Sequence, residues 1–145
     1  MKRILTNKYF LLLIRISIGF IFIYAGAEKI SDTEAFAISI SNYRLLPVST
    51  LNFFAITLPW LEIITGILLL FGIAVKENSV IIFTMLSIFT IAIIISLFRG
   101  LSIDCGCFGK GTPIGLLKLG ENLLMIVGLL ILVVYGSDYL KLESD

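Results

Sequence analysis

The sequence contains no histidine, and charged residues are scarce in it. Histidine is the commonest general base and the commonest metal ligand, so its absence excludes the usual form of both kinds of site. Charged residues make up 14% of the 145 residues, against about 25% in soluble domains. The net charge is only +1, and no strong run of one sign occurs, so the sequence predicts no nucleic-acid partner.

Apolar residues, in contrast, make up 59% of the chain and gather in four stretches, at about 9–27, 53–74, 79–98 and 114–135. Each stretch is long enough to cross the hydrocarbon core of a bilayer. The runs are uninterrupted rather than alternating, which is typical of membrane helices and not of barrel strands. The sequence therefore predicts an all-α fold, an integral membrane four-helix bundle formed by one domain over residues 1–145, with the lipid bilayer as its first partner.

The segment between the first two stretches has the pattern of a short helix. Ser31 and Glu34 are spaced as in a capping box, and Phe36, Ile40 and Tyr43 follow at helical spacing. This pattern predicts a short amphipathic helix that lies on the membrane surface with its apolar face toward the lipid. An ordinary structured loop is the alternative.

Four spans place both termini on one side of the membrane and the first and third connections on the other. Positively charged residues are equally divided between the two sides, so the total count does not orient the chain. The first span is preceded by Lys2, Arg3 and Lys8 and followed by Lys29 and Arg44. This local excess favours a cell (inner) membrane protein with cytoplasmic termini and an extracytoplasmic third connection.

The third connection carries the only two cysteines, Cys105 and Cys107, with Gly106 between them. A disulfide across one residue needs a sharp turn, which glycine permits. Such a small ring is strained, and strained disulfides are labile or catalytic rather than stabilising. Nearby Arg99 and Lys110 would favour a thiolate. Two alternatives remain: incidental cysteines, or a soft-metal site for Cu(I), since closed tetrahedral zinc lacks ligands within one chain.

Ionisable residues within the spans form a second candidate site, because such residues in a membrane are functional candidates by default. Arg15 and Glu62 fall at similar expected depths, and Glu121 lies closer to the cysteine side. Each shares a helix face with glycines, which mark helix contacts in membranes; these are Gly19 and Gly26, Gly66, and Gly128. One interpretation is a structural Arg15–Glu62 pair; the other is a polar pocket that holds a quinone head group or relays protons. Glu121 favours the pocket unless Lys118 neutralises it.

Short motifs occur in a fixed order along the chain: Arg15 with Gly19; Gly26 with Glu28 and Lys29; Asn42-Tyr43-Arg44-Leu45-Leu46-Pro47; Pro59-Trp60-Leu61-Glu62 with Gly66; and Arg99-Gly100 followed by Cys105-Gly106-Cys107-Phe108-Gly109. Over nearly the whole chain they resemble the MauE/DoxX family of small four-span membrane proteins, and the cysteine loop resembles its MauE-like members. The fourth span departs from the family pattern, with Glu121-Asn122 in place of Arg-Asn.

The resemblance implies a redox-associated membrane protein; MauE itself supports maturation of the disulfide-rich small subunit of methylamine dehydrogenase. The first functional hypothesis is a thiol–disulfide oxidoreductase in which Cys105 and Cys107 exchange with an extracytoplasmic thioredoxin-like or cysteine-containing client. Electrons would pass to a membrane quinone, with no tightly bound cofactor. Arg15, Glu62 and Glu121 would shape the polar interior, and Lys29, Arg99 and Lys110 would be loop cations. The alternative is a non-catalytic membrane subunit or scaffold of a partner oxidoreductase.

Overall fold

The computed structural model describes residues 1–100 and 116–135. Within them the only regular secondary structure is α-helical. The helices are α1 Lys2–Leu5, α2 Lys8–Ser31, α3 Thr33–Asn42, α4 Val48–Phe71, α5 Val75–Phe98 and α6 Leu116–Tyr135. The helices α2, α4, α5 and α6 are long and apolar enough to cross a membrane. The all-α membrane bundle predicted from the sequence is confirmed.

The bounds of the second and third spans differ from the predicted stretches. Helix α4 begins at Val48 rather than at Phe53, directly after Pro47 at its N-cap. Proline is tolerated at a helix start because its missing N–H breaks no helical hydrogen bond there. It ends at Phe71 because Gly72, at φ 75°, adopts the left-handed conformation that stops helices. The turn therefore lies at 72–74, and residues 75–78, which separate the second and third apolar stretches in the sequence, instead begin α5. Asn78 fixes this turn by donating to the carbonyl oxygens of Ile73 (2.8 Å) and Ala74 (3.1 Å).

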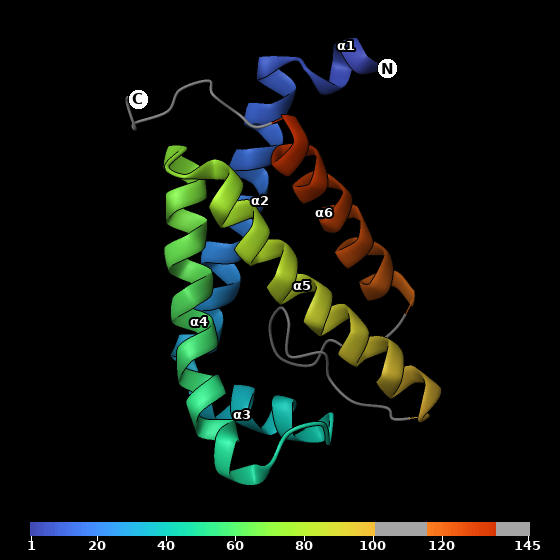
Figure 1. Cartoon of the computed structure of the whole chain (residues 1–145). Coiled ribbons are helices and arrows are strands. Elements are labelled where there is room, and N and C mark those ends of the chain that lie inside the picture. Colours follow the sequence, from blue (N-terminus) through green and yellow to red (C-terminus); the bar gives the residue numbers. More distant parts are fainter. Residues whose placement is uncertain (101–115, 136–145) are drawn as a thin grey trace.

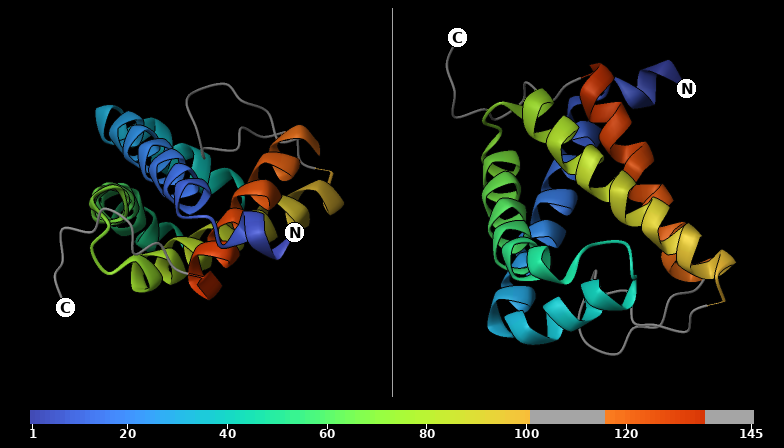
Figure 2. Two further views of the ribbon diagram at one scale, coloured as in Figure 1. Left: turned by 90° about the horizontal axis from the view of Figure 1, so that it is seen from above. Right: turned by 60° about the horizontal axis from the view of Figure 1, so that its bottom comes forward.

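The predicted short helix exists as α3, but its cap and its environment differ from the prediction. Asp32, not Ser31, caps the helix by accepting a hydrogen bond from the Ala35 amide at 3.0 Å. Ser31 ends α2 and donates to the Glu28 carbonyl. Phe36 and Ile40 are buried against α4 instead of facing lipid, and Figures 1 and 2 show α3 lying across the end of the bundle.

Helices α2 and α4 run antiparallel and approach almost to backbone contact (Figure 1). A Cβ atom added to Gly19 would lie 2.9 Å from the Gly66 carbonyl oxygen, and one added to Gly66 would lie 2.9 Å from that of Gly19. A Cβ atom at Gly26 would lie 2.7 Å from the Pro59 carbonyl oxygen. The glycines therefore set the register of this pair, with Gly19 opposite Gly66 and Gly26 opposite Pro59.

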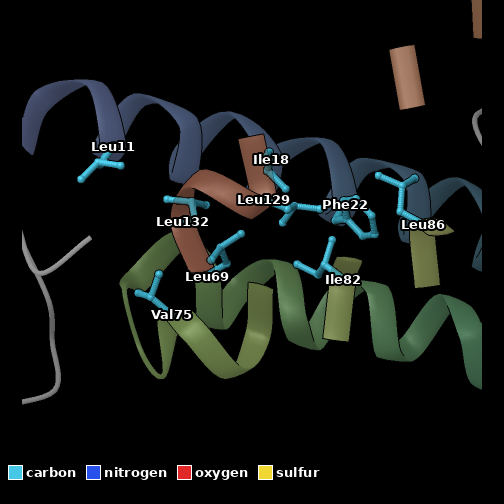
Figure 3. Close-up of a cluster of buried hydrophobic side chains, with 9 residues drawn as sticks. All are labelled: Leu11, Ile18, Phe22, Leu69, Val75, Ile82, Leu86, Leu129 and Leu132. Atoms are coloured by element: carbon cyan, nitrogen blue, oxygen red, sulfur yellow. The ribbon is translucent and has the colours of Figure 1, made fainter. Parts of the chain in front are cut away.

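The other two spans, α5 and α6, also pack together, and the apolar core joins them to the first pair. Figure 3 shows this core, to which all four spans contribute. Its members are Leu11, Ile18, Phe22, Leu69, Val75, Ile82, Leu86, Leu129 and Leu132. In Figure 1 the α5–α6 pair diverges from the α2–α4 pair toward the end that carries α3. That end also contains the buried polar groups described next.

Candidate functional site

A buried ion pair joins the two helices that the glycines bring together. The Nζ atom of Lys29, in the last turn of α2, lies 2.7 Å and 3.0 Å from the two carboxylate oxygens of Glu62 in α4. Both side chains are buried. Removing two charges from water is costly, and the geometry that repays this cost is a close pair with several hydrogen bonds.

The helix register explains why these two residues meet. With Gly26 opposite Pro59, the backbone of Lys29 lies opposite residue 56, about 9 Å along the helix axis from Glu62. Side chains on a helix lean toward its N-terminus. Because the two helices are antiparallel, Lys29 and Glu62 lean toward each other and bridge this separation.

Aromatic rings from two further helices flank the lysine. The centroid of the Phe36 ring in α3 lies 5.1 Å from Lys29 Nζ, and that of Phe89 in α5 lies 5.6 Å away. A cation is attracted to the face of an aromatic ring, more strongly where water is excluded. The ion pair therefore links α2, α3, α4 and α5.

The expected pair of Arg15 with Glu62 is wrong. Arg15 is buried, but the register places it opposite residue 70, about 12 Å along the axis from Glu62. The two side chains also lean away from each other, for the same reason that Lys29 and Glu62 converge. Lys29, expected to be a loop cation, is instead helical and forms the pair. Its place one turn after Gly26, on the same helix face, was the sequence signal for this role.

The expected inward orientation of Glu121 is also wrong. Its side chain is 52% exposed and pairs with Lys118 at 3.1 Å. Asn122, the next residue, is the one that points inward: it is 0% exposed, and its Nδ2 atom donates to Thr90 Oγ1 of α5 at 3.3 Å. Neighbouring helical residues differ by 100° in direction, and Gly128, which shares the face of Glu121, meets α2 only farther along α6.

Of the remaining predicted loop residues, the structure describes Arg99. Arg99 directly follows α5, and its Nη1 atom donates to the carbonyl oxygen of Tyr43 at 3.3 Å. This contact ties the segment after α3 to the start of the third connection. Cys105, Cys107 and Lys110 lie outside the described residues. Within residues 1–100 and 116–135, no group of three potential metal-ligating side chains is present.

Tyr43, which lies outside the spans, gives a pH-dependent prediction. Burial raises the pKa of the Tyr43 hydroxyl to about 12, whereas an unfolded tyrosine titrates near 10. Between these values the unfolded chain loses a proton that the folded chain keeps. The free energy of unfolding therefore falls as the pH rises from about 10 to about 12. Below that window Tyr43 is protonated in both states and adds nothing to the pH dependence of stability.

Tyrosinate absorbance, titrated in the parent and in Tyr43→Phe, measures this shift. The difference between the two curves is expected to have its midpoint near pH 12, and a midpoint near pH 10 would contradict the burial argument.

Comparison with known proteins connects this arrangement to one family. The family described as "Methylamine utilisation protein MauE" matches residues 7–135, nearly the whole chain. The chain is 33% identical to a protein named Methylamine utilization protein MauE from Methylorubrum extorquens, over 68% of this chain and 54% of that protein. It is 30% identical to the protein of the same name from Paracoccus denitrificans, over 77% of this chain and 62% of that protein.

A third protein of that name, from Methylophilus methylotrophus, is 33% identical over 61% of this chain and 47% of its own length. The chain thus spans about half to three fifths of the length of these relatives. No solved structure matches the chain significantly.

Proposed function

The chain belongs to the MauE family, and from this premise we propose that it is a membrane thiol–disulfide oxidoreductase that supports disulfide formation in an extracytoplasmic client. The observation that carries the proposal is the Cys105-Gly106-Cys107 sequence in a polar connection between two spans of this family's membrane domain. Membrane helices commonly hold single cysteines as small apolar residues. Two thiols separated by one glycine, in the sequence between two apolar spans, favour redox chemistry instead.

The reaction is an exchange of one disulfide for another. A thiolate of the client attacks the Cys105–Cys107 disulfide, and the protein's S–S bond breaks as a mixed disulfide forms. The second client thiolate then releases the client with its own S–S bond and leaves Cys105 and Cys107 as a dithiol. A strained disulfide is a strong oxidant toward a client. To act again, the dithiol must pass two electrons to an acceptor.

We place the protein in the inner membrane with its termini in the cytoplasm and the cysteine connection outside. The basic residues before the first span favour this orientation, and disulfides persist in oxidising compartments. The relatives are named for methylamine utilisation. We therefore assign the client to the cysteine-rich extracytoplasmic proteins of amine oxidation, with a methylamine-dehydrogenase-type subunit as the first candidate.

Replacement of Cys105 or Cys107 by Ser tests the redox role. Each variant is expected to abolish client oxidation, because neither remaining thiol has a partner with which to form the disulfide. Ser102→Ala in the same connection is the matched control and should leave oxidation unchanged. The measurement is the mass added to the client by a maleimide, which reports its free thiols. If both cysteine variants oxidise the client as well as the parent does, the protein acts as a scaffold and the proposal is wrong.

Labelling of intact cells with a membrane-impermeant maleimide tests the orientation. Label on Cys105 and Cys107 only after reduction is expected, because the pair is then outward-facing and oxidised. Label that appears only after lysis would contradict the orientation.

A further inference from the structure

A second buried polar contact joins α6 to α5, and one of its polar atoms has no partner among the described residues. Asn122 is 0% exposed, and its Nδ2 atom donates to Thr90. Its Oδ1 atom has no hydrogen-bond partner in the part of the chain that the structure describes. A buried amide oxygen without a donor destabilises a dry protein interior, so this atom requires a donor that residues 1–100 and 116–135 do not supply.

This amide belongs to the same polar layer as Lys29 and Glu62. Thr90, its partner, follows Phe89, whose ring faces the Lys29 ammonium group. Lys118 lies one turn before Asn122 on the same face of α6, and its charge acts on Lys29. Lys118 is itself only 12% exposed. The four spans thus contribute polar groups to one layer, at the end of the bundle where the two helix pairs diverge (Figure 1).

The composition of this layer defines the chemistry of a ligand. It has two largely buried ammonium groups, Lys29 and Lys118, which donate to oxygen atoms. It has aromatic rings at Phe36 and Phe89, against which a flat ring can pack. It also has one acceptor, Asn122 Oδ1, that requires a hydroxyl or N–H donor. A lipid-soluble ring whose oxygens accept hydrogen bonds when oxidised and donate them when reduced matches all three features.

We propose that the layer formed by Lys29, Glu62, Lys118 and Asn122 binds a quinone, with the Asn122 carbonyl accepting a hydrogen bond from the hydroxyl of the reduced form. The electron-transfer role of this site rests on the proposed function, whereas binding itself does not. The thiols of Cys105 and Cys107 lose two electrons and two protons and form an S–S bond. The quinone gains two electrons and two protons, and both of its carbonyl groups become the hydroxyl groups of a quinol.

The single tryptophan provides a direct binding assay. Trp60 lies on α4 two residues before Glu62 and is 54% exposed, and quinones quench indole fluorescence. The purified, detergent-solubilised protein is titrated with decylubiquinone and, separately, with its chemically reduced form. Each titration is expected to give saturable quenching of the Trp60 fluorescence. Asn122→Leu is expected to weaken binding of the reduced form about 3-fold to 10-fold, the loss of one hydrogen bond.

Ser79→Ala is the matched control. Ser79 is also 0% exposed with an oxygen that has no partner among the described residues, but it lies 11 residues before Thr90 on α5, about 16 Å along the axis. Its replacement should leave quinone binding unchanged. Asn122→Leu replaces a buried polar side chain by an apolar one of similar size. Thr90 Oγ1 keeps its hydrogen bond to the Leu86 carbonyl at 2.7 Å, so no buried hydroxyl is left without a partner and the variant should fold.

Two outcomes would overturn the proposal: quenching that rises without saturation in the parent, or equal affinity for the reduced quinone in the parent and in Asn122→Leu. The double variant Cys105→Ser/Cys107→Ser separates this inference from the proposed function. It should bind quinone with the parent's affinity even though it cannot oxidise a client. If the parent binds quinone but does not oxidise a client, the quinone site stands and the thiol–disulfide role is wrong. If the parent oxidises a client but does not bind quinone, the thiol–disulfide role stands and the quinone site is wrong.

Discussion

Glu62→Gln is expected to destabilise the bundle more than any other single polar substitution in the described spans. The glutamine has nearly the same shape, but it leaves the ammonium group of Lys29 buried and without its counter-charge. Breaking a buried ion pair by removing one partner costs about 3–5 kcal/mol. We expect a correspondingly lower midpoint for thermal unfolding in detergent, followed by far-UV circular dichroism. Lys29→Met, which leaves the carboxylate alone, should have a similar effect.

Two further variants distinguish a charge effect from a general loss of packing. Lys29→Met combined with Glu62→Leu removes both charges and should recover much of the lost stability, because a buried pair can be replaced by apolar residues at little net cost. Lys118→Met breaks a pair whose carboxylate, on Glu121, is 52% exposed. It should destabilise the bundle less than Glu62→Gln does, because solvent screens such a pair. A Glu62→Gln variant as stable as the parent would show that the ion pair does not hold α2 against α4.

Gly66→Ala is expected to force the same two helices apart. The added Cβ atom would lie 2.9 Å from the carbonyl oxygen of Gly19 and 2.9 Å from Cγ1 of Ile23. Because the first of these is a backbone atom, a change of rotamer does not relieve the clash. Overpacking of this kind costs about 1–3 kcal/mol. The same displacement would stretch the Lys29–Glu62 pair, so the expected loss of stability falls at the upper end of that range.

Other glycines of the bundle provide graded controls for Gly66. A Cβ atom at Gly128 would meet only side-chain tips of Ile14 and Ile18, each at 3.3 Å. One at Gly120 would meet nothing within 4 Å, and alanine is favoured over glycine in a helix by about 1 kcal/mol. Thermal unfolding should therefore rank Gly66→Ala as the least stable and Gly120→Ala as equal to or above the parent. A different order would contradict the close α2–α4 approach.

The spans and their contact faces were predictable from the sequence. An apolar run of about 20 residues determines a membrane helix, whatever its neighbours are. The stripes that contain Gly19 and Gly66 identified the faces on which α2 and α4 meet, because small residues allow close packing in lipid. The family could be recognised in the same way, from motifs that stay in order along the chain. Helix ends were less predictable, because local capping at Pro47 and Gly72 decided them.

The partners within the site were not predictable from single stretches. Glu62 was correctly expected to face the bundle, but its cation was assigned to Arg15 instead of Lys29. The choice between them depends on an offset of a few residues between α2 and α4, and on the tilt of each side chain toward its own N-terminus. Phe36 and Ile40 likewise had the pattern of a lipid-facing helix, yet α4 covers them.

The sequence by itself determined that this chain is a membrane bundle of the MauE type with two cysteines separated by one glycine, because hydropathy and motif order belong to each segment alone. Only the tertiary structure decided that Lys29 neutralises Glu62 and that Asn122, not Glu121, faces the interior. The reason is geometric: a shift of one residue rotates a helical side chain by 100° and moves it 1.5 Å. The pairing of groups across a bundle therefore depends on the register of all its helices together.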